Sequence, residues 1–297
     1  MQALLAGSGE ELARNLLVLS RDETQRDGII ADDGHVGLIW LLRAGADSKT
    51  TQYAADALVK LGFQSTERTL RLVQAGVAAP VVALLRTAPT VSNQVVLRHA
   101  ANLVNNLATT SAGLDAFQKA GAIATLVSLL GAAPVVADDA AGALWNLSYD
   151  PETEKPTNRA EILEAGAIPP LVALLHGETA STAAGALRNL VNDPAGAVAV
   201  RSAGGIVPLV ALLHAAEAKT TENAATALNN LGCNDQQSRP TILAALAARP
   251  PPTPPHDVRP LLAELLTFLR PIATERLATA EAGDDAAALQ QAIDQAA

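Results

Sequence analysis

The stretch AGAIPPLVALL, residues 165–175, recurs along the chain at a nearly constant spacing. Further copies are AGVAAPVVALL (75–85), AGAIATLVSLL (120–130) and AGGIVPLVALL (203–213), and DGHVGLIWLL (33–42) is a weaker one. An alanine-rich phrase follows each copy: AADALVKL (54–61), AANLVNNL (100–107), AAGALWNL (140–147), AAGALRNL (183–190) and AATALNNL (224–231). LARNLLVL (12–19) fits the same frame as an isolated first copy. Successive alanine-rich phrases lie 40 to 46 residues apart, and this period predicts a solenoid of helical repeats.

Each repeat is predicted to contain three helices. The segment before Ala-Gly supplies a short helix, of which NRAEIL (158–163) is the clearest example. Gly76, Gly121, Gly166 and Gly204 suit the left-handed turn that ends this helix. Proline near the start of the Leu-Leu phrase suits a helix beginning, where a missing N–H is tolerated. The alanine-rich phrase forms the third helix. Strands do not alternate with these helices, so the pattern excludes a parallel sheet.

The composition supports closely packed helices in a reducing compartment. Of the 297 residues, 49% are hydrophobic but only 2% are aromatic, so small and aliphatic side chains must fill the core. The net charge of −9 argues against binding to nucleic acid. Without a run of about 18 uncharged apolar residues or a basic N-terminal segment, we expect neither membrane insertion nor a signal peptide. The single cysteine, Cys233, fits a cytoplasmic or nuclear protein and is expected to be buried.

The chain shows no motif of enzymatic chemistry. It has no P-loop, dinucleotide-binding fingerprint or HExxH sequence, and its five histidines lack the spacing of metal ligands. We therefore expect a protein that is not an enzyme and that uses no cofactor or metal ion.

A rotation of about 100° per residue separates the two faces of the third helix. Within each eight-residue phrase, positions 1, 2, 4, 5 and 8 are almost always Ala, Leu or Val, and we assign them to the core. Positions 3 and 7 lie on the outward side, together with the residue before the phrase. Position 7 reads Val18, Lys60, Asn106, Asn146, Asn189 and Asn230. Position 3 reads Arg14, Asp56, Asn102, Gly142, Gly185 and Thr226, and the preceding position reads Glu11, Tyr53, His99, Asp139, Thr182 and Asn223.

Four consecutive asparagines at position 7 favour a binding role over a purely structural one. Asparagine is a mediocre helix former, whereas its amide offers a donor and an acceptor that can pair with both groups of a peptide bond. Stacked helices lie about 8–10 Å apart, so the asparagines would form a ladder along one groove. The alternative is that each asparagine caps its own helix end or bonds to a neighbouring loop.

The order of the phrases resembles the armadillo repeat family over roughly residues 12–232. AAGALWNLS (140–148) and NRAEILEAGAIPPLVALL (158–175) are close to the wording of its consensus. The resemblance implies an all-α, right-handed α-solenoid of about five three-helix armadillo repeats with partial or divergent capping repeats. It also implies a concave groove lined by the third helices, whose asparagines hydrogen-bond the backbone of an extended peptide. A HEAT-like array, the nearest alternative, lacks the short first helix.

Side chains beside the asparagines are expected to give specificity. Trp145 lies either at the groove's edge or under the following loop, Arg98 and Arg188 suit an acidic ligand side chain, and Asp138, Asp139 and Glu222 suit a basic one. The candidate peptide contacts are Asn106, Asn146, Asn189, Asn230, Asn102, Trp145, Arg188, Asn229, Asn223, Thr226, His99 and Asp139.

The sequence thus predicts a protein–protein interaction scaffold whose partner is an extended or disordered segment of another protein. The alternative is an architectural subunit that docks into a larger assembly by its ends or convex face. Nuclear-import adaptors of the family carry tryptophan four residues before the asparagine, where this chain has Asn102, Gly142, Gly185 and Thr226, so cargo binding of that type is the weaker hypothesis.

We divide the chain into four segments on the extent of the repeats. Residues 1–20 form an N-terminal partial repeat or cap, and residues 21–232 form the repeat array. Residues 233–271 form a divergent C-terminal capping repeat with a Pro-rich loop at 250–255 and a helix at 261–269, and residues 272–297 form an acidic, alanine-rich tail.

Overall fold

The computed structural model describes residues 8–150 and 155–248, which are mostly helical. The chain divides into two compact units, Met1–Ala165 and Gly166–Ala297. Three series of helices alternate along the described residues, and we call them the first, second and third helices. Five complete triplets follow an opening third helix, which confirms the predicted all-α fold of about five three-helix repeats.

Each series has a characteristic sequence. The short first helices are α2 (Glu23–Ala31), α5 (Thr66–Gln74), α8 (Ser111–Lys119), α11 (Arg159–Glu164) and α14 (Pro194–Ser202). The second helices carry the Leu-Leu phrase and are α3 (Gly34–Leu41), α6 (Ala78–Leu85), α9 (Ala122–Leu129), α12 (Ile168–Leu174) and α15 (Ile206–Leu212). The third helices carry the alanine-rich phrase and are α1 (Gly9–Arg21), α4 (Lys49–Gly62), α7 (Gln94–Leu107), α10 (Pro134–Leu147), α13 (Ala180–Leu190) and α16 (Ala218–Asn234).

The remaining elements of the described chain are short. Two 3₁₀ turns, η1 (Leu42–Ala44) and η2 (Gln236–Ser238), extend helix ends, and α17 (Arg239–Ala248) is the last described helix. The two-residue strands β1 (Tyr149–Asp150) and β2 (Lys155–Pro156) pair antiparallel, with Tyr149 opposite Pro156.

Side-chain caps define where several first helices begin. Ser65 accepts a hydrogen bond from the backbone N–H of Arg68 at 3.3 Å, and Thr110 accepts one from Gly113 at 3.1 Å. These bonds satisfy N–H groups that have no partner within the first turn of a helix. These caps therefore fix the boundary between α4 and α5 and between α7 and α8.

The turn between the first and second helices contains a left-handed residue. Gly76, Gly121, Gly166 and Gly204 have φ angles of 80°, 74°, 77° and 75°, which confirms the predicted role of these glycines. In the weaker first copy the left-handed residue is Asp33, with φ 57°. Aspartate tolerates this conformation better than most residues with a Cβ atom.

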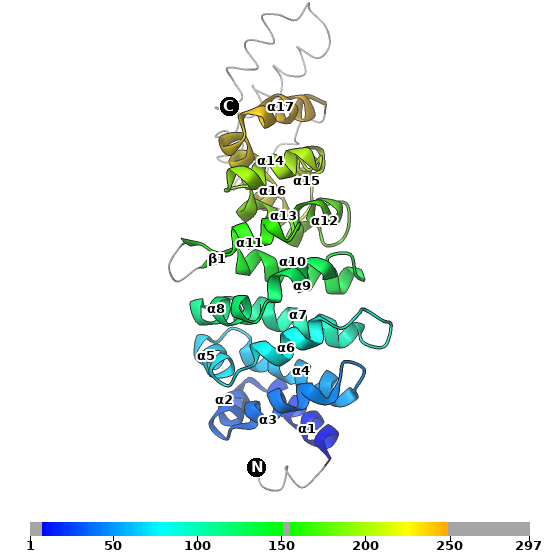
Figure 1. Ribbon diagram of the computed structural model, residues 1–297, viewed down its shortest axis with the longest axis vertical. Coiled ribbons are helices and arrows are strands. Elements are labelled where there is room, and N and C mark those ends of the chain that lie inside the picture. Colours follow the sequence, from blue (N-terminus) through cyan, green and yellow to red (C-terminus); the bar gives the residue numbers. More distant parts are fainter. Residues whose placement is uncertain (1–7, 151–154, 249–297) are drawn as a thin grey trace, which may run out of the picture. The chain divides into compact units, whose positions relative to one another are not determined.

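In the unit Met1–Ala165, the third helices α1, α4, α7 and α10 stack in chain order, each packed on the next (Figure 1). The first helices α2, α5 and α8 form a second row beside them, and the second helices α3, α6 and α9 each pack on the third helix of their triplet. The predicted core face of the third helix is confirmed, because Ala100, Ala101, Leu103, Val104 and Leu107 of α7 are all fully buried.

The unit Gly166–Ala297 repeats this packing with its own helices. The third helices α13 and α16 pack against each other, and the second helices α12 and α15 lie on α13 and α16 respectively. Helix α17 packs on α15 and α16. The same core positions are buried, as Ala183, Ala184, Ala186, Leu187 and Leu190 of α13 show.

Helix α1 departs from the predicted register by one residue. Its buried side chains are Ala13, Leu16, Leu17 and Ser20, so the repeating phrase occupies residues 13–20 and not 12–19. The run Leu16-Leu17 allows both alignments in the sequence, and packing on α4 selects one of them.

Two expectations concern residues beyond the repeats. Cys233 was expected to be buried, and this is wrong: α16 continues to Asn234 and leaves Cys233 exposed. The Pro-rich loop at 250–255, the helix at 261–269 and the tail at 272–297 lie outside the described residues.

Among the described helices, only two bent pairs of short helices are together long and apolar enough to cross a membrane. In the described ranges no single helix has both the length and the apolar character needed to cross a membrane. Only when α5 is taken with α6, or α14 with α15, does a pair meet those requirements, and the pairs are bent by 82° and 91°.

Candidate functional site

A cavity of about 520 Å³ opens on the outward side of the third helices in the unit Met1–Ala165, and we call it the third-helix cavity. It is lined by α4, α7 and one residue each of α2 and α10, together with Phe63 directly after α4. The lining residues are Arg26, Asp56, Val59, Lys60, Phe63, Arg98, His99, Asn102, Asn106 and Asp139. Four of the residues singled out from the sequence, His99, Asn102, Asn106 and Asp139, thus lie around one space.

Three of these side chains form a continuous chain of hydrogen bonds. The amide Nδ2 of Asn106 donates to Oδ1 of Asn102 at 3.1 Å, and Nδ2 of Asn102 donates to the carboxylate of Asp139 on α10 at 2.7 Å. The carboxylate can only accept, so it determines the orientation of both amides. Among the described residues nothing pairs with Oδ1 or the second amide hydrogen of Asn106. Asn106 therefore keeps one donor and one acceptor for a ligand.

Burial changes the ionisation of Asp139. Loss of solvent and the nearby Asp138 raise the pKa of its carboxyl group above the ordinary value of 3.8, while the bond from Asn102 and the charge of Arg98 act in the opposite direction. Burial thus disfavours the charged form of Asp139, and the carboxylate already accepts a hydrogen bond from Asn102.

His99 lines the cavity but offers little surface to a ligand, because only 8% of the residue is exposed. Its Nε2 lies 3.1 Å from the guanidinium of Arg98, which can only donate, so this nitrogen accepts and the ring is neutral. Burial lowers the pKa of His99, Arg98 and Lys60 lower it further, and Asp56 opposes them. The preceding position of the phrase, predicted to face outward, is here covered by the neighbouring third helix.

Asn146 joins α10 to α7. Its Nδ2 donates both to the backbone carbonyl of Asn105 and to the side-chain Oδ1 of Asn105, each at 2.8 Å. The carbonyl of Asn105 belongs to the last turn of α7, where carbonyls have no partner within the helix. Both amide hydrogens of Asn146 are therefore used inside the protein, and only its carbonyl oxygen is left for a ligand.

Asn230 makes the equivalent contact in the unit Gly166–Ala297. Its Nδ2 donates to the backbone carbonyl of Arg188, in the last turn of α13, at 3.3 Å. Asn192 donates to the same carbonyl at 3.2 Å, and Asn234 donates to the carbonyl of Val191 at 3.1 Å. Asn146 and Asn230 thus cap the preceding third helix, a role that the sequence did not predict.

The arginine at position 6 of α13 is already paired. Arg188 lies 3.5 Å from Glu222 and 3.3 Å from Oδ1 of Asn223, both on α16. Asn223 also donates to the carbonyl of Ser181 at 3.2 Å and is fully buried between the two helices.

The other candidate residues of this unit differ in exposure. Asn229 is only 7% exposed, so it and Asn223 lie away from any surface that a peptide can reach. The hydroxyl of Thr226 donates to the carbonyl of Glu222 at 2.8 Å. Asn189, like Trp145 of the unit Met1–Ala165, is half-buried.

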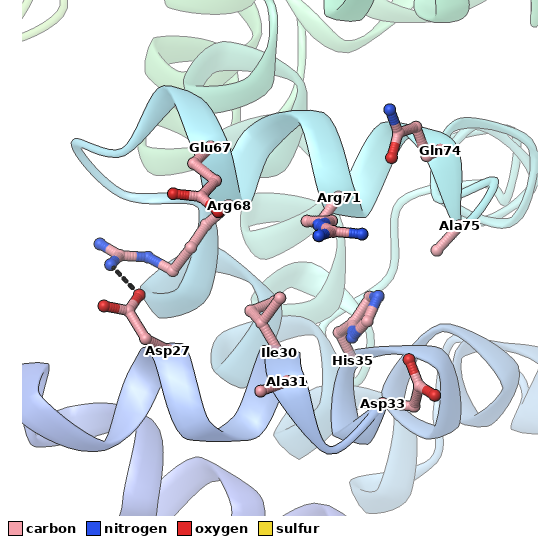
Figure 2. A pocket seen from close by; sticks show the side chains of 10 residues that line it. All are labelled: Asp27, Ile30, Ala31, Asp33, His35, Glu67, Arg68, Arg71, Gln74 and Ala75. Atoms are coloured by element: carbon pink, nitrogen blue, oxygen red, sulfur yellow. Dashed lines mark hydrogen bonds and ion pairs between the residues drawn. The ribbon is translucent and has the colours of Figure 1, made fainter.

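A second cavity, of about 590 Å³, lies away from the third helices and was not expected from the sequence. It is bounded by α2, the start of α3, and α5 (Figure 2). Arg68 on α5 donates to the carboxylate of Asp27 on α2 at 2.8 Å and to the carbonyl of Leu61 at 2.7 Å. It therefore connects the two first helices. The imidazole of His35 extends toward Arg71, and burial lowers its pKa, with Arg71 adding to the effect and Asp33 opposing it.

The repeats of this chain match a known family. The family model for the Armadillo/beta-catenin-like repeat matches residues 155–191 and 193–232, each of which contains one first, one second and one third helix. Residues 155–191 and 193–232 are thus armadillo repeats, and the fold of the chain is that of an armadillo-repeat solenoid. A search of the curated proteins finds no match to it.

Solved structures of engineered proteins share this armadillo fold. One engineered protein has a TM-score of 0.68 and 27% sequence identity, with 78% of this chain and 95% of the other covered. Another has a TM-score of 0.75 and 24% identity, with 99% and 77% covered. A designed armadillo repeat protein in complex with the peptide (KR)4 has a TM-score of 0.57 and 23% identity, with 88% and 99% covered.

Proposed function

We propose that this armadillo-repeat protein is an interaction scaffold that binds an extended segment of a partner protein along the outward side of its third helices. The observation that carries the proposal is the third-helix cavity, where Asn106 keeps a donor and an acceptor beside charged side chains. An extended peptide presents one N–H and one C=O per residue, and an amide side chain can pair with both.

The designed relative that is complexed with (KR)4 supports a peptide as the class of ligand. Within the proposal, Asn106 pairs with the peptide backbone, while the carbonyl oxygen of Asn146 accepts from a peptide N–H. Asn189 is the corresponding contact of the unit Gly166–Ala297, and Trp145 supplies an apolar contact beside Asn146. Arg188 is left out because Glu222 and Asn223 already pair with it. Asn223 and Asn229 are left out because they are buried.

The test begins with a selection of random 12-residue peptides on the immobilised protein. The recovered peptides, labelled with a fluorophore, are then titrated by fluorescence polarisation against the wild type and two amide-deleted variants. Asn106→Ala is expected to weaken binding about fivefold, the worth of one net hydrogen bond. Gln74→Ala, which removes an exposed amide of α5 away from the third helices, is the control and is expected to leave the affinity unchanged.

Two outcomes would count against the proposal. One is a selection that recovers no peptide binding to the folded protein. The other is equal binding of recovered peptides to wild type and Asn106→Ala, combined with loss of binding in variants of the second helices, which would favour the architectural alternative.

A further inference from the structure

The charged side chains of the third-helix cavity are unequally paired. Lys60 lies 3.9 Å from Asp56 in the same helix, and Arg26 lies 3.8 Å from Glu23 and donates to the carbonyl of Ser20 at 2.8 Å. The cavity therefore contains three permanent cations but only two carboxylates, Asp56 and Asp139. The carboxylate of Asp139 is half-buried and accepts a hydrogen bond from Asn102 at 2.7 Å.

Arg98 is the cation without a carboxylate partner. In residues 8–150 and 155–248 it forms no ion pair, and its contact with Nε2 of His99 uses one of the five N–H donors of a guanidinium. The residue is exposed, and it shares the cavity with Lys60 and Asn106. An exposed guanidinium with unused donors is the group that binds a carboxylate most specifically, because two parallel N–H···O bonds can form.

Arg188 provides the contrast. The sequence places Arg98 just before the third-helix phrase and Arg188 within it, and both suit an acidic ligand side chain. In the structure Glu222 at 3.5 Å and Asn223 at 3.3 Å pair with Arg188. Arg98 lies near enough to Asp139 for its charge to act on that carboxyl group, but among the described residues it forms no ion pair. The packing of α16 against α13 satisfies one arginine internally, and the other is left facing the cavity.

We propose that the third-helix cavity is a subsite for an acidic side chain, Asp or Glu, of the bound segment, with Arg98 as its direct partner. Lys60 adds a second positive charge from α4, and Asn106 holds the adjacent peptide backbone. A basic side chain is disfavoured here, since it would meet three cations and two carboxylates that already have partners. This inference rests on the proposed peptide-binding function and adds the chemistry that the bound segment must carry.

The probes are three fluorescein-labelled octapeptides, (ES)4, (QS)4 and (KS)4, titrated into the full chain by fluorescence polarisation. Binding of (ES)4 is expected to be about tenfold tighter than binding of (QS)4, as one charge-assisted hydrogen-bond pair provides. The preference is expected to fall at 0.5 M NaCl, where exposed charges are screened. The net charge of −9 repels an acidic peptide, so a preference for (ES)4 cannot come from the overall charge of the protein.

Three variants test whether Arg98 causes the preference for (ES)4. Arg98→Ala is expected to abolish the difference between (ES)4 and (QS)4, and Arg98→Lys is expected to keep part of it because the charge remains. Arg188→Ala is the matched control, since its charge is already neutralised by Glu222, and it is expected to retain the preference. Circular dichroism confirms that each variant is folded.

The outcomes separate this inference from the proposed function. Equal or tighter binding of (QS)4 or (KS)4, or an acidic preference that survives Arg98→Ala, overturns the acidic subsite alone if randomly selected peptides still bind and depend on Asn106. If neither the octapeptides nor any selected peptide binds, the proposed function fails and the subsite fails with it.

Discussion

The turn between the first and second helices requires one residue with a positive φ angle, which favours glycine. A Cβ atom in this conformation costs about 1–2 kcal/mol. At Gly121, with φ 74°, the added methyl group would come within 3.2 Å of the guanidinium of Arg86 and of nothing else nearby, so backbone strain is the main cost. Gly121→Ala is therefore expected to lower the free energy of unfolding by about 1–2 kcal/mol in urea denaturation. Gly131→Ala, at an open site without a positive φ, is expected to be nearly neutral, and equal losses in both variants would contradict this account.

The same turn shows what a single sequence can predict at this scale. Gly76, Gly121, Gly166 and Gly204 were recognisable because only glycine enters the left-handed region without cost. Asp33 was not, because the neighbouring Gly34 completes an Asp-Gly pair that looks like the Ala-Gly of the other copies. In the structure Gly34 begins α3 and Asp33 adopts the left-handed conformation.

Two of the asparagines at position 7, Asn146 and Asn230, link neighbouring third helices. In Asn146→Ala, the carbonyl and the side-chain oxygen of Asn105 lose their donor in a half-buried position. Leaving such groups unpaired costs about 1–3 kcal/mol, so we expect a loss of unfolding free energy in this range. Urea denaturation followed by circular dichroism measures it.

Asn106→Ala is the matched comparison for that prediction. The amide of Asn106 bonds only to Asn102 within its own helix, at 3.1 Å, and alanine is the better helix former. Its unfolding free energy is expected to stay within about 0.5 kcal/mol of the wild type. A loss as large as that of Asn146→Ala would mean that the link between α7 and α10 is not what stabilises this region.

The helical wheel predicted the core of each element but not the contacts between elements. It correctly placed Ala100, Leu103 and Leu107 inside, because their burial follows from the helical period alone. It treated the opposite face as open, although the preceding third helix covers His99 and Asn223 and accepts the hydrogen bonds of Asn146. A helical wheel represents one isolated helix. Which donors and acceptors of a polar side chain are bonded to a neighbouring helix is therefore visible only in the folded structure.

The whole molecule has a net charge of −9. Two buried imidazoles, those of His35 and His99, are expected to make its stability depend on pH near neutrality. Burial lowers the pKa of both His35 and His99 below the ordinary value of 6.5. As the pH falls through 6.5, the unfolded chain takes up protons at these rings while the folded chain does not, so the free energy of unfolding decreases. We expect a lower thermal midpoint at pH 5 than at pH 7.5.

Substitution of the two rings tests which groups cause this dependence. His35→Gln with His99→Gln removes both titrations, and its thermal midpoint is expected to change less between pH 7.5 and pH 5 than that of the wild type. Asp139 acts in the opposite sense, because its raised pKa lets the folded chain bind a proton before the unfolded chain does, and it is unchanged in the double variant. His176→Gln, which alters an exposed ring, is the control and is expected to keep the wild-type dependence. A double variant that loses as much stability on acidification as the wild type would show that other groups control the acid response.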